Sequence, residues 1–470
     1  MATENSIPEV IQSTEIKEEP VVSRKKEIAK QVWDYLYSQW FFFALAILII
    51  IARWWPQFAK DNGLIKGQYS LGYLMPAIIF FKSGSDIPFS DIKTNMIKWR
   101  QHVISQTFSF LISSSIAYGF CLAIIKSNNK NIDKWTLAGI IVSMCCPTTI
   151  ASNIVMSKKS NANFSLTICS TVLGNSLGAF ISPAVVQLFM KGEFDFANPA
   201  NNSSGVTGVY RRVMKQLGCC LFVPFFIGQM VRIWYLSEIQ WFWKTFRLTK
   251  LGSVCLLMIM FNSFSTAFAQ HAFTSVSHIN IIFLCFFNVG LYLFLSLLTY
   301  FLVRPYIVLL ILKMNAKEIA IFKRQRSFEV EEIKEGDEYK NANFIKKFKL
   351  ANNGLTFKHF IANFWFDKKD TVSLLLCTAA KTAALGVAIM TSEYGADKDK
   401  IGQLLVPLVL YQSEQVIVAN FQTTFFKKWI NLGEGDEEYA ARYIEEREEK
   451  RQAENEKKSL TSDSTNQDPK

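Results

Sequence analysis

Charged residues are scarce in this sequence: only 19% of its 470 residues are Asp, Glu, Lys or Arg, against roughly 25% in a typical soluble domain. Histidine is scarcer still, with four residues, and no two cysteines have the Cys-x-x-Cys spacing. The chain also has no EF-hand loop and no nucleophile–base or cofactor motif. We therefore expect no enzyme, no catalytic residues, no cofactor and no metal-ion site.

The sequence is rich in long apolar stretches. Between residues 38 and 426 the sequence has about ten mostly apolar stretches of roughly 17–25 residues, each long enough to cross a bilayer as a helix. We predict an all-α polytopic membrane protein with ten transmembrane helices. They lie near 38–55, 69–83, 102–125, 135–157, 164–190, 213–236, 250–270, 279–303, 371–391 and 401–426.

Three polar segments flank these spans. Residues 1–37 lack the apolar core of a signal peptide, and we expect a disordered cytosolic tail. Residues 304–370 form a basic cytosolic insert between the eight helices of 38–303 and the two helices of 371–426. Its apolar patches, Phe344 to Phe348 and Phe357 to Trp365, are expected to form surface helices. Residues 427–470 form a charged cytosolic tail.

The placement of basic residues predicts the orientation in the membrane. They gather before the first span (Arg24 to Lys30), after the eighth (Lys313 to Arg326) and after the tenth (Lys427 and Lys428). Ten spans put these regions on one side, which the positive-inside rule makes the cytosol. Two overlapping glycosylation sequons at Asn201 and Asn202 then lie outside. The net charge of +12 fits loops against anionic lipid, and we expect no nucleic-acid partner.

The nine cysteines all fall inside the proposed spans, so we expect no disulfide framework. The adjacent pairs Cys145-Cys146 and Cys219-Cys220 could bind a metal, but the chain has few histidines to join them.

Ten spans divide into five and five, and the second half then has inverted topology, as in many secondary transporters. One interruption falls in the fourth span of each half. In the first half, Pro147 follows two cysteines and precedes Thr148, Thr149, Ser152 and Asn153. Proline removes a backbone donor, so the helix should break there and free carbonyls for a solute or ion. In the second half the interruption is a small-residue run from Cys377 to Gly386.

Lys381 and Glu414 are the only ionisable residues near the middle of a proposed span. A charge at that depth costs at least about 2.5–3.5 kcal/mol, so it normally faces a cavity or a partner. The two have opposite signs on consecutive spans, and we expect a direct or water-bridged pair. The alternative is an inert pair that fixes helix packing.

At these residues the chain resembles the bile acid:sodium symporter superfamily, in its divergent "solute carrier family 10 member 7"-like branch. The resemblance covers roughly residues 38–430. It rests on three stretches: Phe80 to Gly84, Cys146-Pro147 through Ser152-Asn153, and Thr378 to Leu385 with Tyr411 to Gln415. It implies a ten-helix 5+5 inverted repeat with two broken crossing helices, a panel domain, and a core domain of spans three to five and eight to ten.

In the sodium-coupled relatives the crossover Ser-Asn, a span-five hydroxyl and a ninth-helix Glu form the sodium sites. Here Cys377 stands in place of that Glu and Lys381 in place of a Gln, so the expected activity is sodium-independent. A tethered ammonium could supply the positive charge that sodium supplies elsewhere. The candidate solute- or ion-binding residues are Pro147, Thr148, Thr149, Ser152, Asn153, Thr171, Asn175, Cys377, Thr378, Lys381, Thr382, Glu414 and Gln415.

The function that the resemblance implies is a multi-pass plasma-membrane solute carrier that negatively regulates cytosolic calcium. Its partners would be membrane lipid and an unidentified small solute or ion. A second hypothesis is a non-transporting regulator that restrains a calcium channel through the insert or the C-terminal tail. A third is a proton-coupled organic-anion carrier with Glu414 as the titrating group.

Overall fold

The computed structural model describes residues 40–198, 218–246, 248–270, 272–274, 276–335, 356–383, 386, 390, 398–432, 438–447 and 449. These residues form helices and turns, with no strand among them. The N-terminal tail, the sequons at Asn201 and Asn202, the patch from Phe344 to Phe348 and residues 451–470 lie outside the described part of the chain.

Helices occupy the first five proposed spans. They are α2 (Trp40–Trp54), α5 (Leu74–Asp86), the continuous run of α7 (Trp99–Thr107), η1 (Phe108–Ile112) and α8 (Ser113–Lys126), then α9 (Lys134–Cys145) with α10 (Ala151–Ser160), and α11 (Phe164–Phe189). The short helices α3 (Pro56–Ala59), α4 (Gly67–Ser70), α6 (Phe89–Met96) and η2 (Gly192–Ala197) connect them. The element η1 is one turn of π-helix inside the third span.

Helices also occupy the other five proposed spans. They are η4 (Gly218–Phe222) with α13 (Val223–Trp234), α15 (Leu251–Ala269), α16 (His278–Val303), α22 (Lys368–Ala379) and α24 (Lys398–Asn431). Between them lie α14 (Leu236–Thr245), η5 (Leu248–Lys250), η6 (Ala272–Thr274), α17 (Tyr306–Leu312), α18 (Ala316–Glu335) and α21 (Phe357–Ala362). The helices α6, α14 and α17 were not expected from the sequence.

Several of these helices are long and apolar enough to cross a membrane. Among the described residues they are Trp99–Lys126, Leu251–Ala269, His278–Leu312 and Gly402–Asn431. Two sharply bent pairs also qualify if each pair is one span, Phe164–Gly178 with Phe180–Phe189 and Gly218–Trp234 with Leu236–Thr245. The helices α2 and α9 are apolar but shorter. The chain is therefore a polytopic helical membrane protein, while the count of ten spans stays a prediction.

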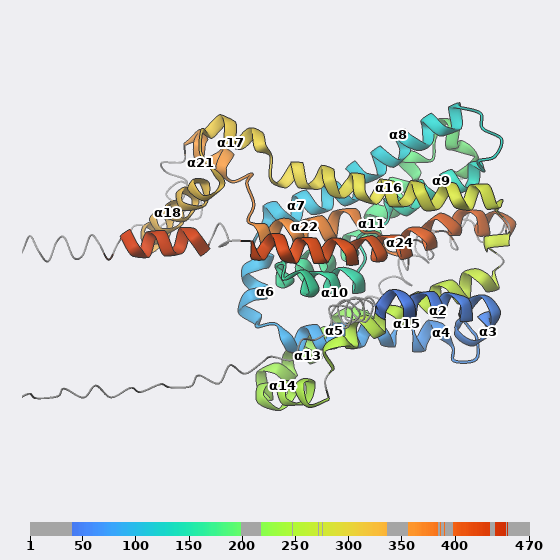
Figure 1. Cartoon of the computed structure of the whole chain (residues 1–470), viewed down its shortest axis with the longest axis horizontal. Coiled ribbons are helices and arrows are strands. Elements are labelled where there is room, and N and C mark those ends of the chain that lie inside the picture. Colours follow the sequence, from blue (N-terminus) through green and yellow to red (C-terminus); the bar gives the residue numbers. More distant parts are fainter. Residues whose placement is uncertain are drawn as a thin grey trace, which may run out of the picture.

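The helices pack in two groups (Figure 1). One group, the lower layer of the figure, contains α2, α5, α13 and α15. The other contains α7 to α11, α16, α22 and α24. In the first group α5 and α13 approach closely, because a Cβ added to Gly228 would lie 2.3 Å from the Phe81 carbonyl oxygen. The two groups have the membership that the resemblance implies for a panel and a core.

The insert contains a small folded unit at one end of the bundle (Figure 1). The helices α17, α18 and α21 share an apolar core of Val308, Leu312, Ile319, Ile361, Ala362 and Trp365. The buried Arg304 lies 4.5 Å from the ring centre of Trp365 and 5.4 Å from that of Trp429. Cation–π contacts of this kind attach the insert to the end of α24. The end of the bundle that carries this unit is called the insert end below.

Candidate functional site

The structure contains both interruptions that the sequence predicts. The first lies between α9 and α10, where Cys146 has an extended backbone with ψ 153° and Pro147 follows it. The second follows α22, where Ala380 is extended with ψ 144°. Because proline offers no N–H and extended residues leave the helical hydrogen-bond ladder, each break frees backbone groups inside the core.

The two breaks contact each other directly, and the place where they meet is called the crossing below. The Thr382 N–H donates to the Pro147 carbonyl oxygen at 2.9 Å, although 235 positions separate the two residues. Gly178 of α11 makes room for this crossing, since a Cβ at that position would lie 2.6 Å from Pro147 Cγ. Gly174, the other glycine of the Gly174-x-x-x-Gly178 motif, faces Gln106 of α7 instead.

Four of the predicted site residues meet beside the first break. Asn153 Nδ2 donates to Thr148 Oγ1 at 2.6 Å, and Asn175 Nδ2 donates to the Thr148 carbonyl at 3.0 Å. The Cys377 thiol from α22 contacts the Asn153 side chain. All four side chains are buried. This part of the site therefore combines α10, α11, α22 and the break itself.

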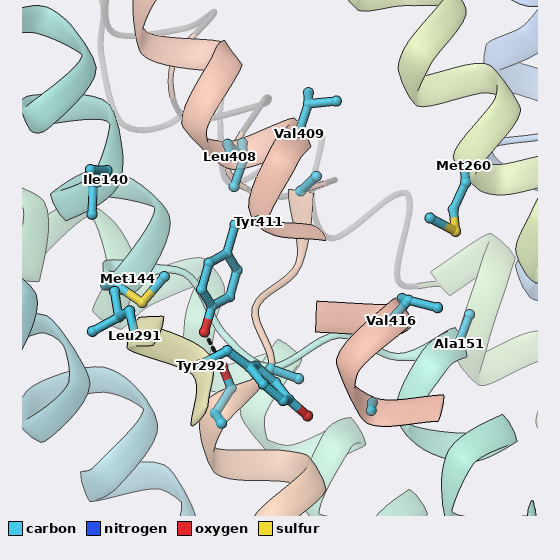
Figure 2. Close-up of a cluster of buried hydrophobic side chains, with 14 of the residues drawn as sticks. Ile140, Met144, Ala151, Met260, Leu291, Tyr292, Leu408, Val409, Tyr411 and Val416 are labelled. Carbon is cyan, nitrogen blue, oxygen red and sulfur yellow. Dashed lines mark hydrogen bonds between the residues drawn. The ribbon is translucent and has the colours of Figure 1, made fainter. Parts of the chain in front are cut away.

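Helix α24 completes the hydrogen bonds of the second break. Gln415 accepts from the Lys381 N–H and donates to the Lys381 carbonyl, both at 2.7 Å. Gln412 accepts from the Ala383 N–H at 2.7 Å, and the Tyr411 hydroxyl donates to the Ala379 carbonyl at 2.7 Å. Three side chains of one helix thus take the place of the helical backbone hydrogen bonds that the second break lacks. Figure 2 shows the Tyr411 ring reaching from α24 to this break, next to Tyr292 and Met144.

The ammonium of Lys381 lies at the crossing and is fully buried. It donates to the Ser109 carbonyl, to Ser109 Oγ at 3.1 Å and to the Cys146 carbonyl at 3.2 Å. The three N–H donors of an ammonium are therefore matched by three oxygen acceptors. Two of these are backbone carbonyls, the kind of ligand that a metal cation also uses.

Sequence analysis did not identify Ser109. This residue lies in η1, where the wider π-helical turn changes the register of the backbone carbonyls. The available signal was the number of polar residues in the first half of this span, with Ser109 among Ser105, Gln106, Thr107 and Ser113 to Ser115. Ser114 bridges to the first break as well, because its hydroxyl donates to the Met144 carbonyl at 2.9 Å.

The electrostatics of the crossing favour a cation. Helices α9 and α22 both end there, and a helix C-terminus carries a partial negative charge.

The expected direct pair between Lys381 and Glu414 does not form. Glu414 instead contacts Cys285 and Asn288 of α16, while its neighbour Gln415 faces the break. Glu414 and Gln415 are consecutive residues of α24, and their side chains point about 100° apart.

Other predicted residues lie near the crossing without joining it. The Thr171 hydroxyl donates to Thr167 and Ile168 carbonyls of its own helix, and Thr378 pairs with Thr299 of α16 at 2.8 Å. Thr149 and Ser152 are buried beside the first break. In the part of the chain that the structure describes, no group of three or more His, Cys, Asp and Glu side chains could hold a metal ion.

A family model matches this sequence over residues 39–428, and its description is the SBF-like CPA transporter family. The chain belongs to this family. Relatives of the chain include the "Solute carrier RCH1" proteins of Candida albicans, 42% identical over 87% of this chain and 93% of the relative, and of Saccharomyces cerevisiae, 45% identical over 86% and 87%. The "Sodium/bile acid cotransporter 7" of Mus musculus is 21% identical over 84% and 94%. The family resemblance expected from the sequence is confirmed, and the chain is a membrane solute-carrier homologue.

The bidentate contact of Gln415 generates a prediction about stability. In Gln415→Ala the Lys381 N–H and carbonyl lose their partner in a buried place, which costs about 1–3 kcal/mol. We expect the purified variant to unfold at a lower temperature than the unaltered protein. The control is Gln422→Ala, on the same helix and half-buried. Equal unfolding temperatures for the two variants would contradict the role of Gln415.

Proposed function

We propose that this chain is a sodium-independent solute carrier in which the Lys381 ammonium replaces a bound sodium ion. The observation that carries the proposal is the set of three oxygen acceptors around Lys381 Nζ, contributed by Ser109 and Cys146. An ammonium has donors and no acceptor, whereas sodium needs oxygen ligands. A fixed ammonium therefore supplies the same charge at the crossing without a sodium gradient.

Within this proposal the membrane region is a ten-helix repeat of five and five. The two breaks support it, because each falls in the fourth proposed span of its half and they meet at the Thr382–Pro147 hydrogen bond. Carriers with this symmetry bind their solutes at such paired discontinuous helices. The two packed helix groups would then move against each other as rigid bodies. A polar link between them is the ion pair of Lys158 on α10 with Asp86 on α5.

The physiological part of the proposal is negative regulation of cytosolic calcium from the plasma membrane, without calcium itself being pumped. It rests on the resemblance to the member 7-like branch. The murine relative has sodium and bile acid in its name, but it is only 21% identical to this chain. By that resemblance, Cys377 and Lys381 stand where the sodium-coupled relatives have a sodium-binding Glu and a Gln. We therefore include neither sodium nor bile acid in the proposal.

A second candidate is an organic-anion carrier coupled to protons through Glu414. The supporting observation is that Glu414 Oε2 is buried and has no hydrogen-bond partner among the described residues. Carboxyl groups inside the membrane form the proton relays of pumps and transporters. This candidate keeps the same crossing and differs in the coupling ion. It requires a transport rate that changes between acidic and neutral external pH, so a flat rate removes it.

Orientation is tested by cysteine accessibility. Lys130 is exposed between α8 and α9, at the end opposite the insert, and Glu318 is exposed on α18. In a Cys219→Ser background, Lys130→Cys should react with a membrane-impermeant maleimide on intact cells. Glu318→Cys should react only after permeabilisation, because the insert and both termini are cytosolic in the proposal. The reverse pattern would refute this orientation.

The role of Lys381 is tested in cells that lack the protein, by recording cytosolic calcium after external calcium is added. We expect larger transients in these cells and normal transients when the unaltered chain is restored. Lys381→Gln should fail to restore them at normal surface abundance, because the crossing loses its positive charge. The matched control is Lys428→Gln, exposed at the end of α24.

The outcomes separate the hypotheses. Unchanged transients in the deleted cells would remove the calcium role. A fully active Lys381→Gln variant would remove the ammonium role. Full activity of the double variant Ser152→Ala and Asn153→Ala, at normal expression, would favour a non-transporting regulator of a calcium channel over a carrier.

A further inference from the structure

Helix α14 turns sharply away from the helix before it. The angle between α13, with its preceding π-turn, and α14 is 110°, and the turn is at Tyr235. Figure 1 shows α14 at the insert end of the bundle, beyond the end of α13. Because α13 belongs to the bundle that crosses the membrane, a helix at this angle lies close to the membrane plane.

The sequence of α14 has two faces. Leu236, Ile239, Trp243 and Phe246 follow one another at intervals of three, four and three residues, which places them along one side of the helix. Gln240 and Lys244, four residues apart, form a polar side, whereas Ser237, Glu238 and Trp241 lie on the side that lines the groove described next. No residue of α14 is buried, and Leu236 and Phe246, beyond the helix end, are 42% and 58% exposed. The rest of the protein covers only part of this apolar face.

An open groove runs along the junction of α13 and α14. Its volume is about 630 Å³. Val231 of α13 lines it together with Tyr235, Ile239, Trp241 and Phe242, and the polar side chains in its lining are Ser237 and Glu238. On the same side of α13, one turn before Val231, Ile227 is exposed. That face belongs to a proposed membrane span, so the groove is continuous with a surface that lipid covers.

Trp243 attaches α14 to a basic cluster at the end of α5. Its indole N–H donates to Ser85 Oγ at 3.1 Å, and Lys82 Nζ lies 4.5 Å from its ring centre. Lys82 and Lys158 both pair with Asp86. Arg232 donates to the Ser85 carbonyl at 3.0 Å. With Lys244 on α14, four basic groups stand here against two carboxylates, Asp86 and Glu238.

We propose that α14 lies in the headgroup layer of the insert-side leaflet and that its groove binds an anionic phospholipid. An acyl chain occupies the apolar groove, and the phosphate lies beside Lys244 and the cluster around Lys82. An amphipathic helix with aromatic residues and lysine has the composition of a helix that lies at the membrane surface. Excess positive charge complements the anionic lipids of a cytosolic leaflet. This inference concerns a lipid site and is independent of how the carrier is coupled.

The position of α14 is tested with spin labels on the full-length protein in lipid nanodiscs. Labels are placed at Phe242→Cys, which lines the groove, and at Gln240→Cys, exposed on α14 outside the groove lining, in a Cys219→Ser background. We expect the label at 242 to collide more with oxygen and the label at 240 to collide more with a water-soluble nickel chelate. Nickel access at 242 would place the groove in water and overturn the proposal. Shielding of 242 from both reagents would mean that protein covers the face, and would overturn it too.

The headgroup preference is tested by titrating phosphatidylserine into phosphatidylcholine nanodiscs that contain the full-length chain and following the label at 242. We expect Lys244→Gln to weaken phosphatidylserine binding about fivefold, because one surface lysine contributes on that order to anionic-lipid binding. The control is Lys130→Gln, the same change at the opposite end of the bundle. Equal effects of the two variants, or equal binding of the two lipids, would contradict an anionic-lipid site.

Discussion

The architecture depends on one constraint: a backbone that breaks inside a membrane must find all its hydrogen bonds within the protein. Two breaks meet here, and they satisfy each other through Thr382 and Pro147. Further backbone groups of the second break are satisfied by Tyr411, Gln412 and Gln415 of α24. This arrangement fixes the rotation of α24 and the approach of α11, where a side chain in place of Gly178 would collide with Pro147.

The same constraint explains why a cation belongs at the crossing. Two helices end there, and carbonyls freed by a break and by a π-turn converge from α9 and η1. Such a place is electronegative unless positive charge is present. Lys381 brings that charge on the chain itself. In the proposed function, this fixed cation separates solute binding from a sodium gradient.

Much of this could be predicted from the sequence, for identifiable reasons. Pro147 marks a break by its chemistry, and Lys381 stands out because a mid-span charge is rare. The family could be recognised from the residues around the same breaks. The partner of Lys381 could not be predicted, because a one-residue difference on α24 decides whether Glu414 or Gln415 faces the break. Ser109 was missed because hydrophobic patterning does not reveal a π-turn. Helix α14 was missed because its 10 residues are fewer than the apolar runs that mark a span.

The most direct test of the central claim is a sodium titration of the unfolding temperature of the purified protein, at constant ionic strength with N-methylglucamine. A ligand that binds only the folded state stabilises it by about 2.7 kcal/mol at one hundred times its Kd. The account predicts no sodium-dependent rise for the unaltered chain, because Lys381 already occupies the crossing. The double variant Cys377→Glu with Lys381→Gln restores the ligand types of the sodium-coupled relatives and serves as the variant expected to respond. A sodium-dependent rise in the unaltered protein would contradict the account.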